Sequence, residues 1–290
     1  MAERSDLFEC KTERWAGAEI ARNSLVVLAL LLLTACSSKP YEPAPVDEIR
    51  PGILRGYLPV ADLPDSLGLL PAPPALGSAA EAQDVWLSGM ALRLKGSPRW
   101  DLAAQDAVYA FPEVAGTFSC AINAPINEVD TPHTYRLLRR SLVDAGYSTG
   151  AAKNHYQRPR PFMVNSQPTC TPDSEAALRD NGSYPSGHTA FGWAWGLILS
   201  ELVPERTNQI IKRGRAYGVS RMVCNVHWSA DVESGRAMGA ATVARLHADP
   251  VFQLDMAAAK QELAELINRG LPPSRNCAAE AAALDFTPVL

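Results

Sequence analysis

Apolar side chains recur every three or four residues along most of the chain, which is the spacing of one face of an α-helix. Strict apolar–polar alternation, the mark of strands, is scarce. From Ser78 onward the pattern predicts helices over residues 79–94, 100–109, 130–144, 189–202, 205–223, 231–248 and 251–268. The segment 189–202 is apolar nearly all round, which predicts a buried central helix. We therefore expect a single all-α domain, a helical bundle, over residues 78–268.

The segments that flank this body have a different character. Residues 39–74 are rich in proline, which excludes long helices. We predict that residues 37–77 form a tether followed by an extended segment laid over the body. Residues 269–290 are expected to form a C-terminal tail.

The N-terminal region carries an export pattern. Leu25–Leu33 is an unbroken apolar run, too short to span a bilayer but suited to the core of a signal peptide. Arg22 supplies positive charge just before it. Residues 33–36 (Leu-Thr-Ala-Cys) resemble the bacterial lipobox, in which the cysteine becomes the lipidated first residue. Residues 1–36 are thus predicted to be a signal peptide, with Cys36 as the lipidation site.

Two further expectations follow from this region. Ser37, rather than aspartate, follows the predicted lipidation site, which favours a periplasmic protein tethered to the outer membrane through the lipid anchor alone. Residues 1–21 are long and mixed in charge for the segment that precedes such a run. We therefore predict that the true start codon lies near Arg22.

Composition and charge narrow the class of protein. Hydrophobic residues make up 47% and charged residues 20% of the 290-residue chain, as in ordinary globular proteins. The net charge of -4 argues against nucleic-acid binding, which needs concentrated basic charge. If the chain is exported, four cysteines remain after Cys10 and Cys36 are set aside, and an even number in an oxidising compartment predicts two disulfides. No two are spaced like a zinc hook, so no metal site is expected. The four are Cys120, Cys170, Cys224 and Cys277.

Three clusters in the body carry chemistry. The first runs from Lys153 to Arg160 and Pro161. The second is the stretch 182–189 (Gly-Ser-Tyr-Pro-Ser-Gly-His-Thr), which opens the central helix. The third is Ser-Arg at 220–221, followed by His227 and Asp231. Each has an ordinary structural interpretation by itself, as a solvated basic face, a turn with a cap, or a His–Asp pair at a helix start.

Together the clusters resemble the signature of the type 2 phosphatidic acid phosphatase and vanadium haloperoxidase superfamily. That signature is Lys-x6-Arg-Pro, then Pro-Ser-Gly-His, then Ser-Arg-x5-His-x3-Asp, and every fixed position is filled here. The stretches 182–189, 155–162 (His-Tyr-Gln-Arg-Pro-Arg-Pro-Phe) and 69–74 (Leu-Leu-Pro-Ala-Pro-Pro) are similar to bacterial class A non-specific acid phosphatases. This likeness covers residues 57–268.

The residue types suit phosphoryl transfer on physical grounds. Lys153, Arg160 and Arg221 supply three cations for the phosphate oxygens. Ser186 offers a hydroxyl donor, and Gly187 lets the backbone at a helix N-terminus approach an anion. The resemblance implies that His227 is the nucleophile, oriented by Asp231, and that His188 is the general acid and base.

The resemblance also sets the expected reaction and partners. It implies a phosphoric monoester hydrolase, an acid phosphatase with a broad range of small phosphomonoester substrates and a phosphohistidine intermediate. No cofactor is expected, and vanadate should bind as a phosphate mimic. Relatives are commonly oligomeric, so a homo-oligomer is among the expectations. Convergence of the motifs on one phosphate would bring Cys170 near Cys224, which favours the pairs Cys170–Cys224 and Cys120–Cys277.

Three alternatives share parts of this signature. An integral-membrane lipid phosphatase would need several apolar spans, and no second long apolar run exists. A vanadate-dependent haloperoxidase would have the same pocket, but the class A flanking sequence argues against it. A non-catalytic phosphate-binding lipoprotein would not need a positioned pair of histidines.

Overall fold

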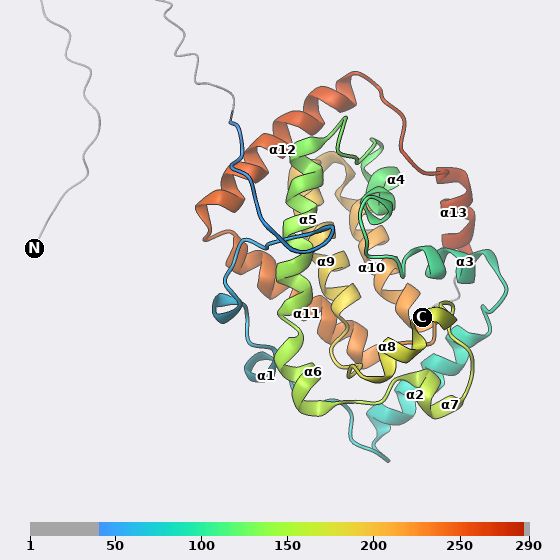
Figure 1. Cartoon of the computed structure of the whole chain (residues 1–290). Coiled ribbons are helices and arrows are strands. Elements are labelled where there is room, and N and C mark those ends of the chain that lie inside the picture. The colour runs from blue at the N-terminus through green and yellow to red at the C-terminus, as the bar shows by residue number, and fades with distance from the viewer. Residues whose placement is uncertain (1–40, 287–290) are drawn as a thin grey trace, which may run out of the picture. The chain divides into compact units, whose positions relative to one another are not determined.

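A computed structural model of the chain describes residues 41–286 (Figure 1). The chain divides into two units, Met1–Glu42 and Pro43–Leu290. Only the last two residues of the first unit are described. The predicted signal peptide, the start near Arg22 and the lipidation site Cys36 lie outside the described residues and stay predictions.

The second unit is built almost entirely from helices, which confirms the all-α prediction. One short hairpin of β1 (Glu48–Arg50) and β2 (Ile53–Leu54) precedes them. The longer helices are α2 (Ala79–Leu92), α3 (Pro98–Gln105), α5 (Pro132–Tyr147), α9 (Gly187–Leu202), α10 (Thr207–Val223), α11 (Ser229–Leu246) and α12 (Pro250–Asn268). The shorter ones are α1 (Ser66–Leu69), α4 (Ser119–Ile122), α6 (Gly150–Tyr156), α7 (Pro161–Asn165), α8 (Glu175–Arg179) and α13 (Cys277–Asp285).

Helix α9 is the central element, as its all-round apolar pattern predicts. It packs against α5, α10 and α11, and Figure 1 shows it among these helices. Trp195, Ile198 and Leu199 on α9 are fully buried. Ser186 is the N-cap residue of this helix, and its hydroxyl accepts a hydrogen bond from the Thr189 backbone N–H. The start of α9 is therefore fixed by a side-chain cap, which costs about 1 kcal/mol when lost.

Helix α11 approaches α9 through small residues. A Cβ at Gly235 would lie 2.5 Å from the Ser186 carbonyl oxygen, and one at Gly239 would lie 2.4 Å from the Ala190 carbonyl oxygen. Only glycine fits such contacts with backbone. The Ser186 backbone N–H donates to the Asp231 carbonyl oxygen at 2.9 Å. As a result, α9 and α11 begin side by side.

The packed body is longer than the helical pattern predicts at both ends. Tyr57 and Leu58, within the predicted extended segment, belong to the hydrophobic core. Their backbone N–H groups donate to the Asp144 carboxylate at 2.8 and 3.1 Å. At the other end, residues 277–285 of the predicted tail form α13, capped by the Asn276 side chain. The tail prediction missed this helix because it is short and held by distant contacts.

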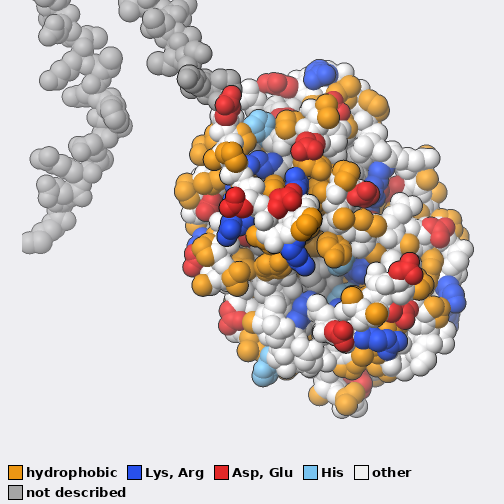
Figure 2. Space-filling model, in the orientation of Figure 1, with side chains coloured by type: hydrophobic (Ala, Val, Ile, Leu, Met, Phe, Trp, Pro, Cys, Tyr) orange, Lys and Arg blue, Asp and Glu red, His pale blue; other side chains and the backbone are white. Residues whose placement is uncertain are grey.

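The surface mixes charges of both signs. Figure 2 shows acidic and basic side chains interspersed on the face in view, with hydrophobic side chains between them. No helix within residues 41–286 combines the length and the hydropathy needed to cross a bilayer.

Candidate active site

The three sequence clusters meet where α9 and α11 begin. The Lys153 ammonium group donates to the Gly182 carbonyl oxygen at 2.7 Å, which joins the first cluster to the second. Arg160 Nη1 lies 3.1 Å from His227 Nε2, which joins the first to the third. The bond from Ser186 N–H to Asp231 joins the second to the third. The N-termini of α9 and α11 therefore lie close together, and a helix N-terminus favours an anion.

The contacts of the His227 ring favour one tautomer. The ring is buried in the turn between α10 and α11, with Nδ1 3.3 Å from Asp231 Oδ2 and Nε2 3.1 Å from Arg160 Nη1. A carboxylate only accepts hydrogen bonds, and a guanidinium only donates them. These two contacts favour the tautomer with the proton on Nδ1 and a lone pair on Nε2.

Arg160 is held in place by backbone carbonyl groups. Its Nε donates to Leu178 and Asn181 at 2.9 and 3.1 Å, and its Nη1 donates to Val226 at 3.0 Å. Burial, and then the charge of Arg221, lower the pKa of Arg160 to about 10. The group stays charged at any pH near neutral, so it is a fixed cation beside His227 Nε2.

Arg221 is a buried cation with unused donors. Its side chain is 2% exposed, and its Nε and Nη1 have no hydrogen-bond partner within residues 41–286. Leaving a charged donor buried and unpaired is strongly unfavourable unless a ligand supplies the acceptor. The positive charge of Arg221 also lowers the pKa values of Lys153, His188 and His227, so it acts on the same space. These free donors are able to bind an anion.

Ser186 and Gly187 contribute donors from the start of α9. The Ser186 oxygen accepts hydrogen bonds from Thr189 N–H at 3.2 Å and from Thr189 Oγ1 at 2.9 Å, which leaves its own proton for another acceptor. A Cβ at Gly187 would lie 3.9 Å from Lys153 Cε. The backbone at Gly187 therefore borders the Lys153 side chain. Burial, and then Arg160, lower the pKa of Lys153 to about 7, so its full charge is present in acid.

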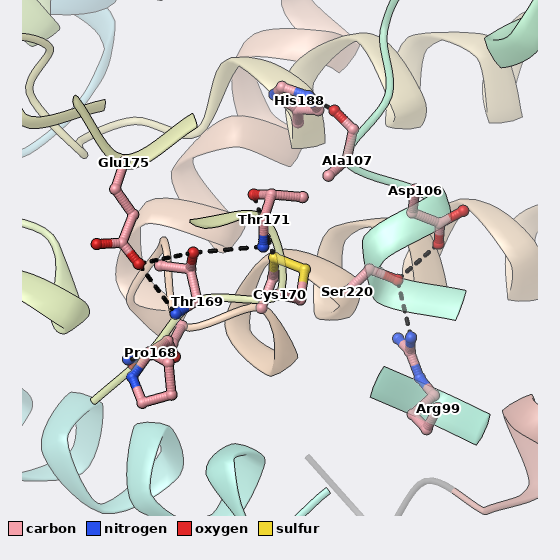
Figure 3. The surroundings of a disulfide bond; sticks show 12 residues. Arg99, Asp106, Ala107, Pro168, Thr169, Cys170, Thr171, Glu175, His188 and Ser220 are labelled. Carbon is pink, nitrogen blue, oxygen red and sulfur yellow. Dashed lines mark hydrogen bonds between the residues drawn. A yellow bond between two sulfur atoms is a disulfide. The ribbon is translucent and has the colours of Figure 1, made fainter. Parts of the chain in front are cut away.

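His188 is held by a contact with the loop that follows α3. Its Nε2 lies 3.0 Å from the Ala107 carbonyl oxygen, as Figure 3 shows. A carbonyl oxygen only accepts, so Nε2 carries a proton and Nδ1 is the atom that can gain or lose one. The Tyr109 ring meets His188 edge to face, with the ring centroids 5.6 Å apart.

A cluster of buried polar groups supports the last turn of α10, where Arg221 lies. Ser220 donates to Asp106 Oδ2 at 2.6 Å and accepts from Arg99 Nη1 at 2.9 Å (Figure 3). Asp106 also pairs with Arg213, whose Nη1 donates to the same oxygen at 3.1 Å. The serine of the Ser-Arg motif therefore anchors the end of α10.

Two residues that the sequence patterns did not single out also lie at the site. Arg158 Nη1 donates to Asp231 Oδ1 at 2.8 Å, and its Nη2 donates to Asp84 Oδ2 at 2.8 Å. Arg158 lies within the family-like stretch 155–162, which was the one sequence signal that pointed to it. Asp84 had none, because a lone aspartate in a predicted helix suggests a solvent-facing position.

Comparisons with known proteins show which family this chain resembles. The PAP2 superfamily model matches residues 137–253, which contain all three clusters. A non-specific acid phosphatase of Salmonella typhimurium is 44% identical over 195 residues, covering 67% of this chain and 78% of that protein. One from Providencia stuartii is 43% identical over 72% of this chain and 85% of its own length. An acid phosphatase of Zymomonas mobilis is 41% identical over 69% of this chain and 75% of its own length.

The chain belongs to the non-specific acid phosphatases of the PAP2 superfamily. The family resemblance and the enzyme class, phosphoric monoester hydrolase, are thereby confirmed. In this acid phosphatase the three clusters of the family signature contact one another at one site. Among the described residues, no group of three or more His, Cys, Asp or Glu side chains is arranged to hold a metal ion.

Two disulfides link distant parts of this phosphatase, and they are the pairs that the sequence favoured. Cys170–Cys224 joins the loop after α7 to the residue that follows α10, three residues before His227. Cys120–Cys277 joins α4 to α13. The loops that they close span 54 and 157 residues. In the chain-entropy relation such loops correspond to about 4 and 5 kcal/mol.

Removal of each disulfide is expected to have a different effect on catalysis. Cys120→Ala with Cys277→Ala should lower the free energy of unfolding by a few kcal/mol and leave kcat unchanged. Cys170→Ala with Cys224→Ala should lower stability and also lower kcat, because the turn that holds His227 loses its anchor. Denaturant unfolding and p-nitrophenyl phosphate assays on both double variants test this. Equal kcat values in the two would contradict it.

Proposed function

We propose that this phosphatase hydrolyses small phosphomonoesters in two steps, through a phosphohistidine on His227. The observation that carries the proposal is the buried Arg221 guanidinium. It has free donors, and its positive charge lowers the pKa of His227. A phosphate group would give these donors their acceptors. Lys153, Arg160 and Arg221 would neutralise its oxygens, with the Ser186 hydroxyl and the first N–H groups of α9.

In the first step His227 Nε2 attacks phosphorus. The N–P bond forms as the bond from phosphorus to the ester oxygen breaks, and protonated His188 gives the Nδ1 proton to the leaving alkoxide. The His227 ring becomes cationic, and Asp231 stabilises it through Nδ1–H. Arg160 Nη1, which lies 3.1 Å from Nε2, would move onto a phosphate oxygen.

In the second step water replaces His227. His188 Nδ1, now neutral, takes a proton from the water as its oxygen attacks phosphorus and the N–P bond breaks. Phosphate leaves and His227 regains its lone pair. One residue serves both steps because the second reverses the proton transfer of the first.

The proposal includes a metal-independent reaction and a broad substrate range. Three side-chain cations supply the charge that a metal ion gives in other phosphatases, so activity should survive EDTA. The contacts proposed for the phosphate lie on the phosphoryl group rather than on the leaving group, which supports a range of alcohols.

We also propose periplasmic localisation through a lipid on Cys36. Labelling of the wild type, but not of Cys36→Ser, with radioactive palmitate would support the anchor.

A rapid-quench experiment tests the central step. The enzyme is mixed with 32P-labelled p-nitrophenyl phosphate in EDTA at acid pH and quenched in alkali within milliseconds. We expect label on the protein that is stable to alkali, lost in acid and mapped to the peptide containing His227. Steady turnover with no labelled protein would refute the phosphohistidine.

The pH profile of kcat/KM should fall as the pH rises towards neutrality. Burial, and then Arg221, lower the pKa of His188 well below its ordinary value, and Lys153 has a pKa of about 7. Both groups act in the protonated form, so both shifts remove activity as the pH rises. Burial, and then Arg160 and Lys153, also lower the pKa of His227, which keeps the nucleophile neutral in acid. A profile that keeps rising through neutral pH would contradict this scheme.

Vanadate should act as a competitive inhibitor. Its charge and oxygen geometry match those of the phosphate that Arg221 is proposed to hold, and it can accept a bond from a histidine nitrogen. Inhibition kinetics with p-nitrophenyl phosphate measure the effect, and a bromination assay with bromide and peroxide follows on the same loaded sample. Absence of inhibition would contradict the anion site, and efficient bromination would favour the haloperoxidase alternative.

A further inference from the structure

Arg158 forms a bridge between two buried carboxylates, those of Asp231 and Asp84. It lies between α6 and α7, and its two terminal nitrogens donate to Asp231 Oδ1 and Asp84 Oδ2, each at 2.8 Å. The side chains of Arg158, Asp84 and Asp231 are 10%, 3% and 0% exposed. The Arg158 guanidinium also lies 5.4 Å from the centre of the Trp228 ring. The bridge is therefore buried rather than a pair on a solvated surface.

The two oxygens of Asp231 have separate partners. Oδ2 accepts from the Trp228 backbone N–H at 2.9 Å and faces His227 Nδ1 at 3.3 Å. Oδ1 accepts from Arg158. Arg158 and the Trp228 N–H each hold one oxygen, and together they fix the carboxylate plane with Oδ2 facing His227.

Asp84 fixes the far end of the bridge. It lies on α2, and its Oδ1 accepts from the Ala230 backbone N–H at 2.9 Å, in the first turn of α11. Asp84 thus holds both Arg158 and the helix that carries Asp231. Its negative charge also offsets that of Arg158, so the bridge adds no net charge to a site already crowded with cations.

We propose that Arg158, held by Asp84, is a positioning residue that sets the charge and the orientation of Asp231 for phosphoryl transfer to His227. The inference rests on the proposed phosphohistidine mechanism. Asp231 can stabilise a cationic, phosphorylated His227 only as a carboxylate. Burial raises the pKa of Asp231, and Arg158 is the largest influence that lowers it.

The charged groups that face Asp231 determine the direction of the effect. Arg158 contacts it from the loop after α6, His227 from the turn before α11, and Lys153 acts on it from α6. Asp84 lies beyond Arg158 on α2. Without Arg158 the main nearby positive charge is lost, so Asp231 would protonate at a higher pH. The acid limb of kcat/KM would then move to higher pH.

The test compares Arg158→Gln with Arg158→Lys and with Arg136→Gln. Arg136 is a suitable control because it pairs with buried Asp255 at 3.4 Å, is itself 16% exposed, and lies on α5. We expect Arg158→Gln to lower kcat 10- to 100-fold, to move the acid limb to higher pH and to leave the Ki of inorganic phosphate within about threefold. Arg158→Lys should restore the acid limb but not all of kcat, since one ammonium group cannot span both carboxylates.

Several results would overturn the inference. An unmoved acid limb in folded Arg158→Gln would do so, as would an equal shift in Arg136→Gln. If Arg158→Gln does not fold, Arg158→Lys decides, and an unchanged kcat there would refute the bridge. A wild type that turns over without a phosphoenzyme would instead refute the proposed mechanism, so the two failures are distinguishable.

Discussion

His227→Ala is expected to lower kcat for p-nitrophenyl phosphate by about 10⁴-fold or more, because it removes the nucleophile of both steps. The remaining activity would come from the three cations, which would still bind phosphate and polarise it towards water. The quench experiment should show no labelled protein.

His155→Ala is the matched control for this variant. His155 lies in the first motif but is exposed, and its ring packs on Tyr156 with centroids 4.7 Å apart. We expect its kcat to equal that of the wild type. If His227→Ala retained normal turnover, the proposed mechanism would be wrong even though the family assignment would stand.

Arg221→Met is expected to lower kcat/KM about 10³-fold while raising the thermal stability of the enzyme measured without phosphate. The loss reflects the removal of a cation that binds the transferring phosphoryl group. The gain follows because a buried guanidinium with two unpaired nitrogens is replaced by an apolar chain, a change worth about 1–3 kcal/mol. The variant should therefore have a lower kcat/KM and a higher melting temperature than the wild type.

Phosphate provides a second measurement on the same variant. Inorganic phosphate should raise the melting temperature of the wild type and leave that of Arg221→Met almost unchanged, since binding to the folded state stabilises it. Differential scanning fluorimetry with and without phosphate measures both effects. A lower melting temperature for Arg221→Met without phosphate would mean that Arg221 has a structural partner.

Apolar periodicity and capping residues predicted the limits of two helices to within two residues. The predicted helix 251–268 corresponds to α12 (Pro250–Asn268), and the predicted 189–202 corresponds to α9 (Gly187–Leu202). Caps and apolar periodicity depend on neighbours within a few residues, so they can be read from the chain. The prediction of a helix over 100–109 was wrong at both ends, because α3 begins after the Ser97 cap and ends at Gln105.

The end of α3 shows why tertiary contacts decided that boundary. Asp106, its C-cap residue, is drawn into the buried pairs with Arg213 and Ser220. The chain then leaves the helix, and the Ala107 carbonyl oxygen is free to accept from His188. No periodicity in residues 100–109 encodes a partner more than 80 positions away.

The sequence by itself determined the helical class, the family and the residues of the three clusters, because those signals rest on residue type and local spacing. Only the tertiary structure decided the tautomers of His188 and His227, the unpaired state of Arg221 and the bridge from Asp84 through Arg158 to Asp231. Asp84 and Arg158 are 74 residues apart, and a charged residue on a helix gives no local sign that it will be buried. Which charges meet inside the protein depends on how α2, α6 and α11 pack, and packing sums contacts over the whole chain.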